Sequence, residues 1–394
     1  MQAKTVRVYY LLSFLYSTLG MQIISAVYVT FLMKNGLNLF QVNLVNSIFF
    51  TTLFICEIPT GAFADIFGRK YSFVLSSAIV SLSMFVYGMS SSLSGFICAE
   101  MIAAIGITFR TGAFQAWLVD SLKHHGYEGS LNKIFGRASL YNQIGGGLGA
   151  IMGAYLATEN IALPWLVGGF GMILVTILSS IMMKEEYFKR GVFSLRKGII
   201  SMKETALSSI RYGAKDKAVR FILIVTFIEI YAVQALNMYW QPFFRVYGVK
   251  DEHLGFVFTG MMAFIAIGAF IASRVKVEGR ERYIILWSMA YVGVAVVVAS
   301  VSPFLSVALF FFLIHESGRG FWVPMADSYL HQRIPSHERA TITSFCAIAP
   351  HIGGAIGLVI SGAIAYLFGI TVSWIVAGVV LVSGAFFVRK NGSG

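Results

Sequence analysis

Charged side chains are scarce in this chain. They make up 12% of its 394 residues, against about 25% in an ordinary soluble protein. Hydrophobic residues supply 57% of the sequence, and the mean hydropathy is +0.76. So few charges cannot cover a surface that faces water on all sides, and this excludes a soluble globular protein.

Cysteine is also scarce, and all three cysteines, Cys56, Cys98 and Cys346, fall inside apolar runs. A disulfide framework or a metal cluster is therefore not expected. No Gly-x-x-x-x-Gly-Lys-Ser/Thr loop, zinc motif or hydrolase triad stands out. We therefore expect no enzyme activity and no cofactor, with a proton gradient rather than ATP as the energy source.

Apolar runs long enough to cross a bilayer recur along the whole chain, which is typical of an all-α polytopic membrane protein. The first run is too long for a cleavable signal peptide, and none is expected. We predict twelve transmembrane helices, near residues 8–33, 41–64, 71–89, 94–122, 135–157, 164–183, 219–244, 253–275, 283–300, 303–331, 340–368 and 371–387.

The net charge of +12 indicates how the chain is oriented in the membrane and does not indicate nucleic-acid binding. If the N-terminus is cytoplasmic, 25 of the 30 Lys and Arg residues lie in cytoplasmic segments or at cytoplasmic span ends. Of the other five, Lys34, Arg245 and Lys250 lie outside, and Arg110 and Arg319 lie within the membrane. This asymmetry predicts that both termini are cytoplasmic, and we expect the plasma (inner) membrane as the location.

The two halves of the chain are related. Gly61-Ala-Phe recurs as Gly268-Ala-Phe, and Asp120-Ser recurs as Asp327-Ser, both at an offset of 207 residues. Such spacing indicates a duplicated unit. We predict two pseudo-symmetric six-helix bundles at residues 1–183 and 219–390, joined by a basic cytoplasmic linker at 184–218 with amphipathic interfacial helices. The Asn-Gly-Ser-Gly end at 391–394 is expected to be a cloning remnant.

A short charged hairpin, Gly61-Ala-Phe-Ala-Asp65-Ile-Phe-Gly68-Arg69-Lys70, joins the second and third spans. Charges held between two spanning segments, with glycines that let backbones approach, indicate a structural joint. Asp65 and Arg69 are four residues apart and can pair if the helix continues through them.

This hairpin resembles the signature of the major facilitator superfamily, and it stands between spans two and three as in that family. With twelve spans, a 6+6 repeat and a basic central loop, the resemblance covers essentially the whole chain. The Glu57-Ile-Pro-Thr-Gly61 lead-in, and Arg110 followed by Asp120-Ser-Leu, resemble bacterial efflux-type members, including drug/proton antiporters. The resemblance implies the major facilitator fold, a small-molecule substrate and alternating access. We expect a monomer in the lipid bilayer, with no nucleic-acid partner.

The resemblance also implies a conformational latch. Asp120 matches the acidic residue that the family sets against the arginine of the hairpin, and the start of span eleven near Ala340 offers a positive helix end for Asp65. The latch residues are therefore predicted to be Gly61, Asp65, Gly68, Arg69, Lys70 and Asp120. Such a latch would favour the outward-open state.

Ionisable residues near the middle of a span are costly and indicate function. Counted from span centres, Arg110, Glu229, Glu316 and Arg319 lie at a similar depth, on spans that line the central cavity in the resembled family. Glu229 is the first candidate for a proton-carrying carboxylate, with Glu316 and Glu57 as further candidates.

The roles of some ionisable residues stay open at this point. Glu316 and Arg319 have the i,i+3 spacing of an ion pair that could be purely structural, and His315 either joins a relay or is simply packed. Glu100 is expected nearer the outer face, where water reaches it, and it receives no role.

For the substrate cavity we predict two arginines and several aromatic residues from the same spans: Arg110, Arg319, Tyr231, Trp240, Trp117 and Trp322. The arginines either clamp an anion with bidentate contacts or serve as counter-ions for Glu229 and Glu316. The sequence thus favours a proton-coupled secondary transporter that exports amphipathic organic compounds by antiport. The alternatives are proton-coupled uptake or exchange of an organic anion, and a non-transporting sensor on a transporter scaffold.

Overall fold

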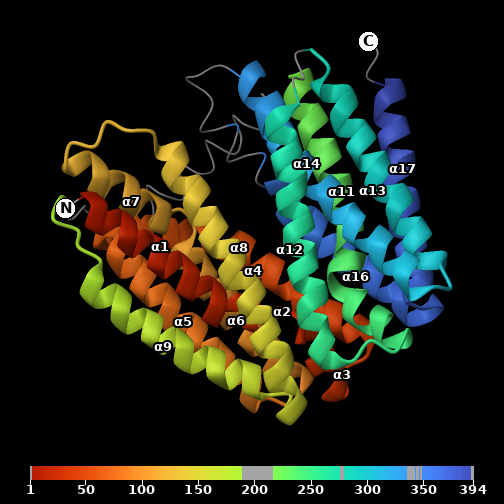
Figure 1. Cartoon of the computed structure of the whole chain (residues 1–394), viewed down its shortest axis with the longest axis horizontal. Coiled ribbons are helices and arrows are strands. Elements are labelled where there is room, and N and C mark those ends of the chain that lie inside the picture. The colour runs from red at the N-terminus through yellow and green to blue at the C-terminus, as the bar shows by residue number, and fades with distance from the viewer. Residues whose placement is uncertain are drawn as a thin grey trace. The chain divides into compact units, whose positions relative to one another are not determined.

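The structure is a computed structural model that describes residues 2–188, 216–275, 279–334, 342, 346 and 348–391. Within these ranges the regular structure is entirely helical (Figure 1). Ten helical stretches in this part of the chain are long and apolar enough to cross a membrane. Two expected spans fall short of that criterion, α8 (Leu131–Glu159) and α14 (Leu305–Arg333), because both carry several charged or polar side chains. With these two included, the prediction of an all-helical twelve-span membrane protein is confirmed.

The chain forms two compact units. Unit 1 consists of Met1–Gly36, Ile48–Gly198 and Val249–Thr259, and unit 2 of Leu37–Ser47, Ile199–Gly248 and Gly260–Gly394. They differ from the expected halves at two helix starts: residues 37–47 belong to unit 2, and residues 249–259 belong to unit 1. The interfacial helices predicted for the linker lie mostly at 189–215, outside the described residues.

Unit 1 is built mainly from the first nine helices: α1 (Gln2–Leu19), α2 (Met21–Ser25), α3 (Tyr28–Lys34), most of α4 (Leu39–Phe67), α5 (Arg69–Met89), α6 (Leu93–Arg110), α7 (Ala113–His124), α8 and α9 (Leu163–Met182). Two expected spans are interrupted in this unit. The first span is divided into α1, α2 and α3, and the fourth is divided into α6 and α7. The breaks of the first span lie at Gly20 and at Ala26 and Val27, and the break of the fourth lies at Thr111 and Gly112.

In unit 1, α5 packs against α6 and α9, while α8 packs against α1 and α2. The glycines of α8 permit the second contact, because a Cβ at Gly149 or Gly153 would collide with the carbonyl oxygen of Thr18 or Ile23. Small residues at such positions let two membrane helices approach at backbone distance. The glycine-rich run of span five therefore holds the broken first span in place.

Unit 2 contains α11 (Lys217–Val246), most of α12 (Asp251–Arg274), α13 (Glu281–Val301), α14, α16 (Ile348–Phe368) and α17 (Ile370–Asn391). Here α13 packs against α14 and α17, and α11 packs against α16 and α17. An aromatic cluster fills the core, with the Trp374 ring 4.1 Å from Phe243 and 5.5 Å from Phe312, measured between ring centroids. Stacked rings of this kind stabilise a core beyond the area they bury.

Large apolar side chains remain exposed on the outer faces of both units. On α9 they follow a helical spacing at Phe170, Ile173, Leu174, Ile177 and Ile181. A stripe this long would be an aggregation site in water. In a bilayer it faces lipid, which agrees with the low charge content of the chain.

Candidate functional site

A cavity of about 580 Å³ opens within unit 1. Helices α1, α5, α6, α7 and α8 and the break between α6 and α7 contribute its lining. Those residues are Tyr9, Ser13, Tyr16, Phe73, Arg110, Thr111, Gly112, Phe114, Gln115, Phe135, Ala138, Ser139, Asn142 and Gln143. A cavity of this volume is within the range that small-molecule sites occupy.

Arg110 is the charged residue of this cavity and the last residue of α6. The helix stops there because the next residues leave helical geometry: Gly112 has φ +74°, a conformation that glycine adopts without a steric penalty. The guanidinium carbon lies 4.7 Å from the centroid of the Tyr16 ring. The Nε of Arg110 is buried and has no hydrogen-bond partner in the described part of the chain. Arg110 thus lines a cavity, and its predicted role in binding a substrate stays a prediction.

Two kinds of side chain surround Arg110. Aromatic rings form one wall, where Tyr9 and Phe114 lie 4.5 Å apart and Phe73 stacks on Phe114 at 4.2 Å between centroids. Amides and hydroxyls form the other, from Gln115 on α7 and from Ser139, Asn142 and Gln143 on α8. Apolar walls with a few convergent polar groups and one cation suit an amphipathic organic molecule.

A cluster of ionisable side chains lies within unit 2. The Nη1 of Arg319 is 2.9 Å from the Oε2 of Glu316, one turn earlier on α14. The Nε of Arg319 is 3.9 Å from the Oε1 of Glu229 on α11. Glu316 and Glu229 are 0% and 5% exposed. The i,i+3 ion pair expected for Glu316 and Arg319 is confirmed. Glu229, which was expected at a similar depth in the membrane, also lies next to Arg319.

Two polar neighbours complete this cluster. The Nη1 of Arg319 also donates to the Oδ1 of Asn237 at 3.1 Å. His315 is fully buried, with its Nδ1 against the carbonyl oxygen of Phe312 and its Nε2 3.5 Å from the Oε1 of Glu316. The guanidinium is thus held by acceptors from two helices. Whether the cluster carries protons stays a prediction.

The joint between α4 and α5 differs from its predicted geometry. The helix ends at Phe67, and Gly68 has φ +104°, so Asp65 and Arg69 do not follow each other on one helix. The condition for a pair of Asp65 with Arg69, a helix that continues through both, is therefore not met, and Asp65 is exposed. Arg69 instead forms an ion pair with Asp120 at the end of α7.

The remaining parts of the latch are partly visible. Lys70 lies in the first turn of α5, and Gly61 lies inside α4, where an added Cβ would meet no atom within 4 Å. Ala340, the proposed partner of Asp65 at the start of span eleven, lies outside the described residues. The switching role of the latch stays a prediction.

Glu185, just after α9, completes this joint, although the sequence did not single it out. Its Oε1 accepts from the backbone N–H of Arg69 at 2.8 Å, and its Oε2 accepts from that of Lys70 at 3.1 Å. A carboxylate at this position satisfies two free N–H groups at the start of α5 and complements the helix dipole. The sequence contained one indication of this role, since Glu185 and Glu186 are the first acidic residues after span six.

The segment around Glu185 is tied to α7 as well. The Trp117 indole donates to the carbonyl oxygen of Lys184 at 2.9 Å, and the Tyr187 hydroxyl donates to that of Trp117 at 3.4 Å. Burial raises the pKa of the Tyr187 phenol well above its ordinary value, with the nearby Glu185 adding to the rise. The hydroxyl therefore stays protonated and remains a donor.

This geometry corrects the assignment of Trp117 to the substrate cavity. Its side chain is buried and holds the segment 184–188 against α7, so the indole is used for packing rather than for binding. The start of the expected linker is thus packed on unit 1.

The other predicted site residues are not among those that line the unit 1 cavity. On α11, Trp240 is buried near Phe312, and Tyr231 stacks near Phe227. Trp322 on α14 is buried, and its indole N–H has no hydrogen-bond partner among the described residues. Glu57 is half-buried on α4, two residues before Pro59. Their roles in binding or coupling stay predictions.

Glu100 requires a second correction. It lies in α6 about two turns from the start of that helix, yet it is 5% exposed rather than reached by water. Counting residues along a helix gives depth in the membrane but not the face that a side chain occupies. The face of α6 that carries Glu100 is turned into unit 1.

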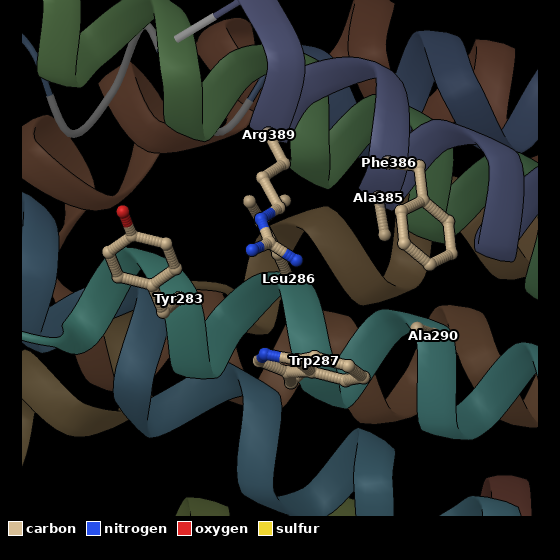
Figure 2. A pocket seen from close by; sticks show the side chains of 7 residues that line it. All are labelled: Tyr283, Leu286, Trp287, Ala290, Ala385, Phe386 and Arg389. Carbon is tan, nitrogen blue, oxygen red and sulfur yellow. The ribbon is translucent and has the colours of Figure 1, made fainter. Parts of the chain in front are cut away.

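A second hollow, between α13 and α17, is a poor candidate for a transported solute. Figure 2 shows Arg389 extending from α17 towards α13, above Trp287 and Leu286. This hollow measures about 20 Å³ and is lined almost wholly by apolar atoms. Trp287 and Phe386 are 60% and 54% exposed, so the hollow opens on the outer face of unit 2, where lipid chains would cover it.

The fold and these sites define a polytopic helical membrane protein with a solute-sized cavity in one unit and a buried charge cluster in the other. The sequence matches the family model of the Major Facilitator Superfamily at residues 10–275 and 222–392. The chain belongs to that superfamily, and it is therefore a membrane transporter by class.

Individual relatives agree with this assignment. The uncharacterized MFS-type transporter YxaM of Bacillus subtilis (strain 168) is 26% identical over 374 residues, covering 92% of this chain and 90% of the relative. Multidrug resistance protein 2 of the same organism is 22% identical over 338 residues, covering 82% and 79%. The crystal structure of the nucleoside transporter NupG matches with a TM-score of 0.79 at 12% identity, covering 100% of this chain and 99% of that one. This last likeness shows the fold alone.

Proposed function

We propose that this protein is a proton-coupled secondary transporter that binds amphipathic organic compounds in the unit 1 cavity and exports them by alternating access. The observation that carries the proposal is the position of Arg110. Its guanidinium lines a cavity of about 580 Å³, packs on the Tyr16 ring, and keeps a buried Nε without a partner among the described residues.

The lining of the cavity supports a particular kind of ligand. A buried donor without a partner is costly, and a ligand acceptor would satisfy it. A planar carboxylate or a similar acceptor suits the guanidinium, which offers donors in a fixed fork. The rings of Tyr9, Phe73 and Phe114 suit an apolar or aromatic body. We therefore propose a ligand with an apolar body and one anionic or strongly accepting group.

Proton coupling is proposed for the cluster in unit 2. Two carboxylates share one guanidinium there, so binding a proton would remove the negative charge that Arg319 leaves uncompensated. Glu316 is paired at 2.9 Å, but Glu229 lies at 3.9 Å. Glu229 is less closely paired with Arg319, and we therefore propose it as the proton acceptor in the transport cycle.

Export is the proposed direction because the sequence is similar to Multidrug resistance protein 2 and carries the efflux-type motifs described above. Uptake or exchange of an organic anion is the second candidate, and Arg110 favours it. A clamp of two arginines is less well supported, since Arg319 already binds Glu316 and Asn237.

A matched-ligand binding experiment tests the cavity. Purified protein is screened by thermal shift against aromatic carboxylates and their neutral methyl esters, because a true ligand stabilises the folded state by mass action. The carboxylates should stabilise the wild type more than the esters do, and Arg110→Gln should abolish that difference. Arg389→Gln, which changes an arginine on the outer face of unit 2, is the matched control and should leave it unchanged. If the difference between carboxylates and esters is the same in Arg110→Gln as in the wild type, the ligand does not bind at Arg110.

A further inference from the structure

Glu100 is the acceptor of a buried hydrogen-bond network in unit 1. The Tyr87 hydroxyl on α5 donates to its Oε2, and the Tyr28 hydroxyl on α3 donates to its Oε1 at 3.4 Å. The two phenol oxygens are themselves 3.2 Å apart. One carboxyl group on α6 therefore connects three helices.

Aromatic rings enclose this network. Phe96 lies 5.8 Å from Tyr87 and Trp165 lies 6.2 Å from it, between centroids, and Phe31 stacks on Trp165 at 4.0 Å. Tyr87, Phe96 and Trp165 are at most 2% exposed. A carboxyl group in such surroundings is costly to keep in either state unless hydrogen bonds satisfy it.

The network holds a short and separate helix. Helix α3 has seven residues and begins at Tyr28, after Ala26 and Val27 have broken the first span. A helix this short has little stability of its own and depends on contacts with its neighbours. The Tyr28 hydroxyl is such a contact, located at the first residue of α3.

We propose that Glu100 is a second proton-binding site, and that its protonation state sets how firmly α3 is held against α5 and α6. An ionised carboxylate accepts charge-assisted hydrogen bonds from both phenols, and these are about twice as strong as neutral ones. A protonated Glu100 carries its own donor and offers weaker acceptors, so the attachment of Tyr28 loosens.

Two titratable side chains contact Glu100, and two charged residues lie further along the helices that carry this network. Tyr28 on α3 and Tyr87 on α5 face it directly. Lys34, at the other end of α3, pairs with Asp251 at 2.9 Å. Arg110, at the far end of α6, is ten residues away, or about 15 Å along the helix. This proposal goes beyond the proposed function, because it needs neither Glu229 nor a substrate.

Infrared difference spectroscopy between two pH values tests the proton site. In membranes without substrate, the wild type should gain a carboxylic-acid C=O band on acidification. Glu100→Gln should lack that band, and Glu229→Gln should keep it. Tyr87→Phe removes a donor to the ionised form, so the midpoint of the band should move to higher pH by about one unit. If Glu100→Gln fails to fold, this shift alone decides the question.

Hydrogen exchange tests the effect on α3. After correction for intrinsic rates, exchange of residues 28–34 should quicken on acidification in the wild type and should be independent of pH in Glu100→Gln. Tyr28→Phe should keep the infrared band but lose the pH dependence of exchange. A spectrum of Glu100→Gln identical to that of the wild type would overturn the proton site. Exchange of α3 that does not respond to pH in the wild type would overturn the control of α3.

Discussion

The Nη1 of Arg319 lies 2.9 Å from the Oε2 of Glu316, and Glu316 is completely buried. Glu316→Gln removes the more closely paired carboxylate but leaves Arg319 with Glu229 at 3.9 Å as its counter-ion, so the cost should be about 2 kcal/mol, less than for a fully broken buried pair. Glu316→Gln should therefore lower the free energy of unfolding by about that amount. Glu229→Gln removes a longer contact of 3.9 Å together with a buried negative charge that Arg319 does not fully compensate, so it should cost about 1 kcal/mol or less. Thermal unfolding of both variants in detergent checks the order, and an equal loss would contradict the unequal pairing.

Gly68→Ala should destabilise unit 1 by about 1–3 kcal/mol. Gly68 has φ +104°, and a Cβ there would lie 2.5 Å from the Oε2 of Glu185. Gly61→Ala in the same hairpin is the control, because that glycine is helical and has open space around it. Alanine is favoured over glycine inside a helix, so Gly61→Ala should be neutral or slightly stabilising. The same thermal-unfolding measurement compares the two, and equal stability would refute the close approach of Glu185.

Glu185→Ala should destabilise the start of α5 by about 1–2 kcal/mol, since two N–H groups lose their acceptor. Faster hydrogen exchange at Arg69 and Lys70 is the measurement. Glu186→Ala is the matched control: its carboxylate lies 3.9 Å from Lys184 and is exposed, and such pairs contribute little. Unchanged exchange in Glu185→Ala would show that the cap is not formed in the membrane.

The ion pair of Arg69 with Asp120 predicts rescue by charge reversal. Arg69→Asp and Asp120→Arg should each lower the transport rate by about fivefold or more, as expected for the loss of at least 1 kcal/mol from one conformation. The double variant should recover most of the rate. If the double variant transports no faster than the single variants, the ion pair of Arg69 with Asp120 does not contribute to the transport cycle.

A second charge reversal provides the control for that experiment. Lys184→Glu combined with Glu186→Lys reverses an exposed pair 3.9 Å apart in the neighbouring segment. It should leave the rate unchanged, alone or in combination. A comparable loss there would mean that any change of charge at this end of unit 1 slows transport.

The sequence predicts contacts within one helix more readily than contacts between helices. The pair of Glu316 and Arg319 follows from an i,i+3 spacing, and it is found. The pair of Asp65 and Arg69 has the same kind of spacing, but Gly68 ends the helix between them. Glu185 could not be assigned to the start of α5, because 115 residues separate it from Lys70 and no periodicity connects them.

Depth in the membrane can be counted from the sequence, but orientation around the helix axis cannot be read from a helix that is apolar on all sides. This is why Arg110 and Glu229 were found as buried functional candidates, while the burial of Glu100 was missed. The tyrosines that bind Glu100 come from α3 and α5. Their approach depends on the helix break before Tyr28, and no proline or glycine next to Tyr28 predicts that break.

Substrate-driven proton movement across liposomes tests the central proposal most directly. Protein is reconstituted, a ligand found by thermal shift is supplied on one side, and the internal pH is followed. Protons should move opposite to the ligand in the wild type and in the control Glu186→Gln, and no proton movement should occur in Glu229→Gln. Ligand transport with equal proton movement in Glu229→Gln and the wild type would contradict the role of Glu229.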